Sequence, residues 1–156
     1  VYLPDSVTNL GKYAFRDCTG LKSLNIPRNL TSVYPTALYK AGAEDSVLTV
    51  CRNPDDNKLG YAHEFDNMQF EHIVFTDGVT EIGERVFSNN DIIKSVTLPD
   101  GLTSIGLSAF GYCDNLSSVT IPESVTYIGE SAFYNIPQIY YNGSAEGAPW
   151  GALKLN

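Results

Sequence analysis

The side chains best suited to acid–base chemistry in this sequence are its two histidines, His63 and His72. A catalytic nucleophile needs a base within hydrogen-bonding reach and a third group that orients that base. The sequence contains no G-x-S-x-G, H-E-x-x-H or glycine-rich phosphate-binding motif that would supply such a set. We therefore predict that the chain is not an enzyme, and a hydrolase that depends on His63 or His72 stands as a remote alternative.

The cysteines and one acidic run are the residues whose types suit a metal ion. Cys18, Cys51 and Cys113 are odd in number, and neither C-x-x-C nor Cys/His spacing accompanies them. The run Asp55-Asp56-Asn57 offers oxygen ligands, but the D-x-D-x-D-G spacing and the distal glutamate of a calcium-binding loop are missing. The sequence therefore predicts no metal site and no cofactor, and the cysteines are interpreted as small apolar core or turn residues.

The overall composition limits the classes of partner. The 156-residue chain is 43% hydrophobic and 18% charged, which is a globular rather than a disordered composition. Its net charge of −8 repels phosphate groups and argues against nucleic acid and anionic membrane surfaces as partners. No apolar run approaches the roughly 18 residues that a membrane-spanning helix requires.

A 23-residue repeat organises the chain. Residues 93–115 and 116–138 align so that each key apolar position recurs after 23 residues, together with a proline and a glycine. The paired positions are Ile93 and Leu116, Val96 and Val119, Leu98 and Ile121, Leu102 and Val125, Ile105 and Ile128, and Phe110 and Phe133. Residues 1–20, 21–43 and 70–92 fill the same slots. Self-similarity at a fixed period of this length is typical of repeat architectures.

Each unit can be interpreted segment by segment. The L-x-x-V-x-I run alternates in polarity and is rich in β-branched residues, which predicts a short strand with its apolar face inward. Proline ends that strand in a P-D-G, P-E-S or P-D-S corner, and V-T-x-I forms a second extended piece. We expect the next glycine to turn a corner with positive φ. The x-x-A-F segment should then form a short helical or 3-10 turn that directs Phe into the core.

Stacking of these units gives the predicted fold. No unit can bury its apolar face alone, whereas stacked units bury one another's faces at about 4.7–4.9 Å per turn. We predict a repeat solenoid, a leucine-rich-repeat right-handed superhelix that is mainly β, with a parallel sheet of short strands on one face and short strands and 3-10 or helical turns on the others. Equivalent residues should form columns, one of Phe15, Leu38, Phe87, Phe110 and Phe133, another of Leu3, Ile26, Val50, Phe75, Leu98, Ile121 and Tyr141.

The stacking also bears on the cysteines. Cys18 and Cys113 occupy the same slot four turns apart, which is about 19 Å at strand spacing. A disulfide requires Cα atoms within about 7 Å. We therefore expect both thiols to remain free.

Two segments depart from the repeat. Residues 44–69 contain one strand-like run, at 47–50, but lack the T-x-I-G and A-F signals, so we interpret them as a degenerate turn with an extruded loop at 51–68. Insertions in solenoids map to loops, often on the binding face, and a tolerated insertion is the alternative. The possible binding-loop residues are Arg52, Asp55, Asp56, Asn57 and Lys58. Residues 136–156 are predicted to cap the last apolar layer, with Trp150 as lid, and residues 1–156 to form one domain of about six turns.

Side chains between the inward-pointing strand residues should face outward. One such row is Tyr2, Asn25, Thr49, Val74, Thr97, Thr120 and Tyr140, and its neighbour is Ser23, Val47, His72, Ser95, Ser118 and Gln138. Rows of Ser and Thr stabilise adjacent strands through cross-strand contacts, which is the purely structural interpretation. The functional interpretation is a concave platform for protein or glycan, with Tyr2, His72 and Tyr140 as its anchors.

The unit L-x-S-V-T-I-P-x-S-V-T-x-I-G-x-x-A-F-x-x-C-x-N resembles the BspA-like leucine-rich-repeat family, closely in residues 93–135 and poorly in 34–69. The ending IYYNGSAEGAPWGA is similar to the closing segment common in that family. The resemblance implies a cell-surface or secreted protein of host-associated bacteria, with adhesion to proteins and no shared catalytic residues. The sequence departs from the family at Tyr34 and Pro35, where glycine and a helix former are usual, and at Asn90, where cysteine is frequent.

The sequence as a whole predicts a non-catalytic interaction or adhesion module. Its expected partner is a protein or glycan at a cell surface, with no membrane insertion in this segment and a monomeric state. A structural spacer that displays other domains is the alternative. The chain opens at Val1, without Met and inside a repeat, so we expect it to be an excerpt of a longer protein. No signal peptide is visible in this excerpt.

Overall fold

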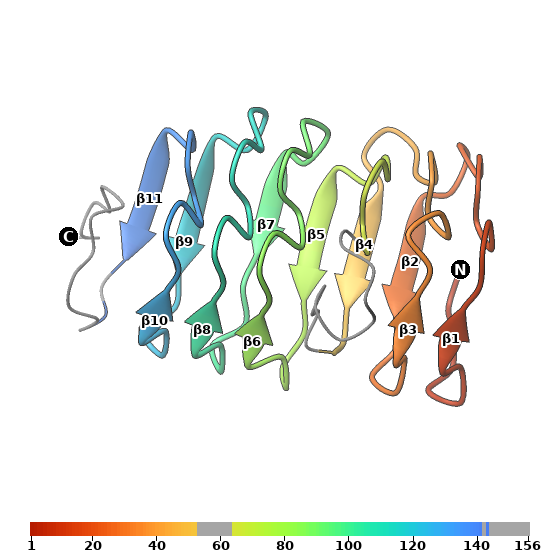
Figure 1. Ribbon diagram of the computed structural model, residues 1–156, viewed down its shortest axis with the longest axis horizontal. Helices are drawn as coiled ribbons and strands as arrows, with labels where there is room; N and C mark the ends of the chain where they lie inside the picture. Colours follow the sequence, from red (N-terminus) through yellow and green to blue (C-terminus); the bar gives the residue numbers. More distant parts are fainter. Residues whose placement is uncertain (53–63, 142, 144–156) are drawn as a thin grey trace.

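The computed structural model describes residues 1–52, 64–141 and 143, and shows a parallel β-solenoid whose turns follow one another along the long axis (Figure 1). No helix is found within these residues. The longer strands are β2 (Ser23–Ile26), β4 (Val47–Val50), β5 (His72–Phe75), β7 (Ser95–Thr97), β9 (Ser118–Ile121) and β11 (Gln138–Tyr141). The two-residue strands are β1 (Asn9–Leu10), β3 (Ser32–Val33), β6 (Glu81–Ile82), β8 (Ser104–Ile105) and β10 (Tyr127–Ile128). The solenoid confirms the fold class predicted from the repeat.

The longer strands form one face of the solenoid and the two-residue strands form another (Figure 1). Strands β2, β4, β5 and β7 pair in parallel in that order, β9 pairs with β11, and β7 lies against β9. Ile26 is paired with Val50 and Val50 with Phe75, although these residues are separated by 24 and 25 positions rather than 23. The predicted apolar column therefore survives the change in spacing, because the additional residues leave the strands themselves in register.

A second column, made of phenylalanine rings, runs through the core. Phe87 and Phe110 stack with ring centroids 5.4 Å apart and an interplanar angle of 1°, and Phe110 and Phe133 stack at 5.7 Å and 3°. Phe65 extends the column, since its ring lies 5.0 Å from that of Phe87 at 5°. The expected stacking of Phe87, Phe110 and Phe133 is confirmed.

The extruded loop predicted at 51–68 is wrong for its last residues. Phe65 and Met68 are buried in the core, and residues 64–67 form a turn like those of the regular repeats. The prediction failed because Glu64 replaces the Ala or Val that precedes Phe elsewhere, which hid the equivalence of Phe65 and Phe87. Residues 53–63, including Asp55, Asp56, Asn57, Lys58 and His63, lie outside the described residues.

The x-x-A-F segments are not the helical or 3-10 turns that the sequence suggested. They are hydrogen-bonded turns with a left-handed residue two positions after the glycine slot, namely Arg85 (φ 53°), Ser108 (φ 50°) and Ser131 (φ 56°). Alternate amides point along the solenoid axis, so that Arg85 N donates to Leu107 O at 2.8 Å and Phe87 N to Ala109 O at 2.9 Å. A helix would have used these amides within its own turn, whereas here they bind one turn to the next.

The glycines of the T-x-I-G motif do not have the positive φ that we expected. Their role is close backbone approach instead. A Cβ on Gly106 would lie 2.6 Å from the carbonyl carbon of Gly83, and one on Gly129 would lie 2.4 Å from the nitrogen of Leu107. Any side chain at these positions would push adjacent turns apart.

The cysteines are free, as the stacking predicted, and only Cys113 is buried. Its thiol donates a hydrogen bond to Phe87 O at 3.1 Å. Burial raises the pKa of the Cys113 thiol to about 11, so this side chain stays protonated and behaves as a core residue.

Tyr141 closes the described part of the C-terminal end. It is buried, and its hydroxyl donates to Val125 O at 2.7 Å. The proposed lid residue Trp150 and the rest of the predicted cap from Ser144 onward lie outside the described residues.

Candidate interaction surface

The outward-facing side chains of the long strands form the two predicted rows. Strand pairing places Ser23, Val47, His72 and Ser95 side by side, and Asn25, Thr49, Val74 and Thr97 side by side. Farther along, Ser118 pairs with Gln138 and Thr120 with Tyr140. Alternate residues of each strand are buried, for example Leu24 and Ile26 in β2, so these rows point away from the core. The pairing confirms the order of the row residues within β2, β4, β5 and β7 and within β9 and β11, whereas Tyr2 lies outside the strands. The use of the rows in binding stays a prediction.

The side-chain amide of Asn25 holds the N-terminal segment in place through two hydrogen bonds. Its amide nitrogen donates to Leu3 O at 2.8 Å, and its amide oxygen accepts from Leu3 N at 2.5 Å. The amino group of Val1 donates to Ser23 O at 2.6 Å and fixes the same segment. These bonds leave the Tyr2 side chain 78% exposed beside the sheet.

A hollow of about 340 Å³ lies at the end of the rows nearest the N-terminus. It is lined by Tyr2, Asp5, Asn25, Arg28, Thr49, Cys51 and Thr76. Arg28 N donates to the Asp5 carboxylate at 3.1 Å, which draws the two corner segments together. The strand pattern identified Tyr2, Asn25 and Thr49, but not Asp5, Arg28 or Thr76, because the latter lie on corners whose side chains follow no alternation.

His72 lies in a network of polar groups that the sequence did not reveal. Its Nδ1 is hydrogen-bonded to Ser95 Oγ at 2.7 Å, and its Nε2 lies 3.9 Å from an Asp45 carboxylate oxygen. Glu71 accepts from Asp45 N at 3.0 Å and from the Lys94 ammonium at 2.9 Å. These hydrogen bonds, from Lys94 first, lower the pKa of the Glu71 carboxyl, and the bond to Glu71 raises the pKa of Lys94.

The Asp45, Glu71 and His72 ligand atoms lie within 4.8 Å of one another, a spacing that a metal ion can bridge. The Lys94 ammonium already provides positive charge at Glu71. We therefore interpret these residues as an ion-pair and hydrogen-bond network. Sequence spacing offered no signal for it, since Asp45 and His72 are brought together by stacking across the irregular turn.

The network around His72 contains a serine, a histidine and an aspartate in sequence, namely Ser95, His72 and Asp45. In a catalytic triad the aspartate is hydrogen-bonded to the histidine. The separation of 3.9 Å between His72 and Asp45 is too long for such a bond. The geometry therefore does not assemble an activated nucleophile.

Arg52 has a structural partner rather than the exposed position expected of a binding-loop residue. Its guanidinium donates to both Glu64 carboxylate oxygens at 2.7 Å, and the side chains of Arg52 and Glu64 are only 11% and 2% exposed. Nη2 of Arg52 makes both of these bonds, and the pair joins the residues that flank the 53–63 segment. Arg52 is therefore not available as a free contact residue, which corrects the sequence-based prediction.

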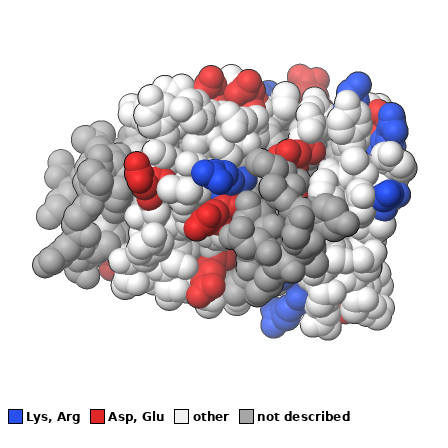
Figure 2. Space-filling view, in the orientation of Figure 1, with Lys and Arg blue, Asp and Glu red and all other residues white. Residues whose placement is uncertain are grey.

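Charge is distributed unevenly along the solenoid. Residues 1–40 contain five Lys or Arg and two Asp or Glu, a net +3, whereas the remaining residues contain five and sixteen, a net −11. Figure 2 shows several basic side chains at the N-terminal end, while acidic side chains are spread over the rest of the viewed face with some basic ones among them. Within the described ranges, no helix has the length and apolar character to cross a bilayer.

The sequence matches the BspA type leucine rich repeat region in six copies, over residues 1–50 and 61–145. The chain therefore belongs to the BspA-type leucine-rich-repeat family. No curated protein matches the chain.

Solved structures of three bacterial proteins share the fold. A leucine rich cell surface protein of Faecalibacterium prausnitzii A2-165 is 27% identical with a TM-score of 0.58, over 92% of this chain and 39% of that one. A leucine-rich repeat protein of Bacteroides ovatus ATCC 8483 is 20% identical with a TM-score of 0.57, over 90% and 38%. A third, from Eubacterium ventriosum ATCC 27560, is 22% identical with a TM-score of 0.55, over 87% and 42%. The chain thus spans about two fifths of the length of these proteins.

Proposed function

We propose that this solenoid is a non-catalytic, protein-binding module of a bacterial surface or secreted protein, and that it contacts its partner through the two outward rows. The observation that carries the proposal is the unbroken parallel register of those rows across β2, β4, β5 and β7. Membership of the family and the cell-surface description of the F. prausnitzii protein support the same role.

The physical character of the rows suits recognition. The backbones of β4 and β5 are fixed on both sides by inter-strand hydrogen bonds, and those of the other long strands on one side, so binding orders few main-chain degrees of freedom. Tyr2 at one end and Tyr140 at the other provide aromatic contact area, and His72 lies between them, oriented by Ser95. Small hydroxyl side chains between these anchors let a partner approach the sheet closely.

A binding screen with immobilised matrix proteins and glycans tests this role, followed by a variant in which Tyr2, His72 and Tyr140 are all replaced by Ala. We expect any specific interaction to weaken by at least about 30-fold, as for loss of an interface hot spot. Tyr112→Ala with Tyr134→Ala is the matched control, since both tyrosines are exposed but lie on the turns rather than on the rows. Unchanged affinity of the triple variant would refute the assignment of the rows.

A structural spacer is the main alternative to adhesion. It predicts that no screened protein or glycan binds the solenoid in a way that depends on the rows. Antibody labelling of intact cells that express the full-length protein would test the proposed surface location separately from binding. We also propose that residues 1–156 form a single monomeric domain, which analytical ultracentrifugation checks directly.

A hydrolase that uses His72 is the remaining alternative, and the Ser95 contact makes it testable. If turnover of ester or peptide substrates were found, it should disappear in Ser95→Ala and in His72→Ala. Our proposal expects no turnover that depends on either residue.

A further inference from the structure

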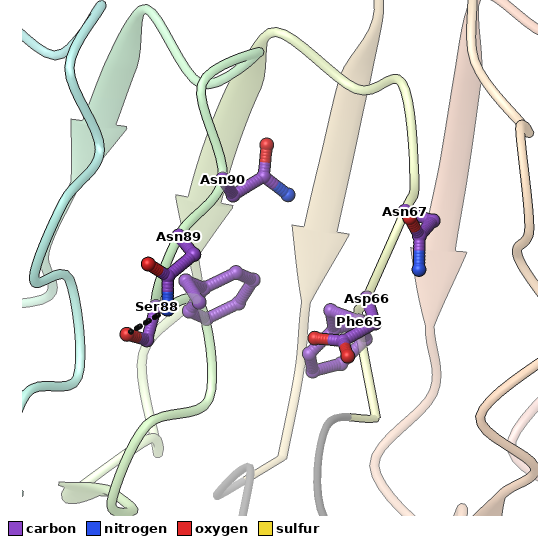
Figure 3. Close-up of a pocket in the computed structure, with 7 residues that line it drawn as sticks. Phe65, Asp66, Asn67, Ser88, Asn89 and Asn90 are labelled. Atoms are coloured by element: carbon purple, nitrogen blue, oxygen red, sulfur yellow. Dashed lines mark hydrogen bonds between the residues drawn. The ribbon is translucent and has the colours of Figure 1, made fainter.

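A polar cleft opens between the irregular turn at 64–68 and the regular turn that follows it (Figure 3). Its volume is about 240 Å³. The lining residues are Phe65, Asp66, Asn67, Phe87, Ser88, Asn89 and Asn90. All of them lie on turn segments, so the cleft is separate from the strand rows and does not depend on their proposed role.

The cleft exists because one inter-turn contact lacks its usual backbone hydrogen bonds. In the regular stack, Phe110 N donates to Ala132 O at 2.8 Å and Tyr112 N to Tyr134 O at 3.0 Å, which closes the rim between turns. Among the described residues, no backbone hydrogen bond joins 64–69 to 85–90. The rings of Phe65 and Phe87 nevertheless stack at 5.0 Å, so the floor is closed while the rim is open.

Asn90 provides an oriented hydrogen-bond donor in the wall of the cleft. The residue is 8% exposed, and its Oδ1 accepts a hydrogen bond from Ile92 N at 3.1 Å. That bond fixes the orientation of the amide and turns Nδ2 toward the cleft (Figure 3). Within the described structure no side-chain or backbone acceptor is bonded to Nδ2, and this atom is not among the buried ones, so a ligand in the cleft can reach it. The equivalent slots of other turns hold Cys18 and Cys113, so this amide is peculiar to the open interface.

The remaining walls offer further donors and acceptors. Asn89 Nδ2 donates to Ser88 Oγ at 3.1 Å, and both residues line the cleft. Asn67 and Asp66 form the opposite wall (Figure 3). Asn67 and Asn89 are held in left-handed conformations, with φ of 55° and 57°, that fix where their side chains begin.

We propose that this cleft binds a single neutral sugar ring, such as a terminal hexose of a glycan. Each sugar hydroxyl both donates and accepts hydrogen bonds, and neighbouring hydroxyls match the paired donor and acceptor of an asparagine side chain. The volume lies below the roughly 300–1,000 Å³ typical of drug-sized ligands, which restricts the occupant to a small group.

The other ligand classes fit the cleft less well. Asp66 and the net charge of −11 beyond residue 40 disfavour anionic sugars and phosphates. One carboxylate is too few for a calcium site of useful affinity. An extended peptide would be expected on an unpaired strand edge, whereas turns form this cleft.

The test uses the methyl glycosides of glucose, galactose, mannose and N-acetylglucosamine, titrated into the ¹⁵N-labelled chain and followed by NMR. We expect at least one glycoside to shift the side-chain amide signals of Asn90, Asn89 and Asn67, with a dissociation constant on the order of millimolar. Asn90→Ser keeps an oxygen for Ile92 N but removes the amide NH2 donor, and Asn67→Gly and Asn89→Gly remove side chains without straining a left-handed backbone. Each should weaken binding by about 2- to 10-fold, the loss of one hydrogen bond.

Asn135→Gly is the matched control. Asn135 is also left-handed, with φ of 71°, but its side chain donates to Asp114 at 2.7 Å and lies outside the cleft. It should leave glycoside affinity unchanged. The proposal is overturned if no glycoside moves the cleft signals, if Asn135→Gly weakens binding as much as the cleft variants do, or if only N-acetyl amino-acid amides, as peptide mimics, produce shifts. None of these results affects the test of the strand rows.

Discussion

The regular turns from residue 83 to 133 and the irregular turn at 44–69 are joined to the turns that follow them by different sets of contacts. In the regular region, stacked rings, close glycine contacts and axial hydrogen bonds all connect each turn to the next. In the irregular region the strand register and the ring of Phe65 are retained, but among the described residues no backbone hydrogen bond joins 64–69 to 85–90. The core therefore tolerates a change of spacing, and the rim opens where the repeat is lost.

Substitutions in the aromatic column should give the largest difference in stability between the regular turns and the irregular turn. Phe110 stacks on a ring above and a ring below, so Phe110→Ala should lower the free energy of unfolding by about 3–5 kcal/mol. Phe65 has one ring partner among the described residues. The free energy of unfolding should therefore fall by about 1 kcal/mol less in Phe65→Ala than in Phe110→Ala. Urea unfolding of both variants measures the difference. An equal loss would mean that the irregular turn is as tightly packed as the regular ones.

Breaking the buried ion pair between Arg52 and Glu64, in the irregular region, should give the next largest loss of stability. Glu64→Gln should lower the free energy of unfolding by about 1.5–3 kcal/mol, because Arg52 keeps its charge but loses a carboxylate partner. A double variant, Arg52→Met with Glu64→Met, should recover much of this loss since no buried charge remains. If the double variant were no more stable than Glu64→Gln, the loss would reflect packing rather than charge.

Close approach of turns in the regular region gives a prediction with a matched control. Gly129→Ala should destabilise the solenoid by about 1–3 kcal/mol, because the new methyl group meets the backbone at Leu107. Gly101→Ala adds the same methyl group where nothing lies within 4 Å, so it should be neutral or slightly stabilising. Thermal unfolding followed by circular dichroism compares the two. Similar melting temperatures would contradict the role assigned to close contact.

The smallest expected effect is the pH dependence of stability that arises from the Glu71–Lys94 ion pair. This pair joins the residue before β5 to the residue before β7. Because the folded-state pKa of Glu71 is lowered, its contribution is present above the ordinary glutamate pKa of 4.5 and is lost as the pH falls through the lowered value. The melting temperature of the wild type should therefore drop more steeply in acid than that of Lys94→Met. Parallel acid profiles would show that the exposed pair adds nothing measurable, as is common at surfaces.

The irregular region also shows where sequence reasoning fails. The sequence marked residues 44–69 as degenerate and Asn90 as unusual, but gave no reason to connect them. Phe65 was missed because its neighbour Glu64 does not match the small residue of the A-F motif. Glu64 is instead buried with Arg52, a partner across a segment whose path no periodic pattern specifies.

By itself, the sequence determined the solenoid, its parallel strands, the apolar and aromatic columns and the composition of the outward rows. It could do so because a fixed period makes every turn the neighbour of the next, so that spacing along the chain specifies contacts in space. Tertiary structure alone decided the hydrogen-bonded form of the A-F turns, the glycine contacts, the pairing of Arg52 with Glu64 and the cleft at Asn90. Each of these depends on how far one backbone sits from another, a distance that polarity and spacing along the chain do not encode.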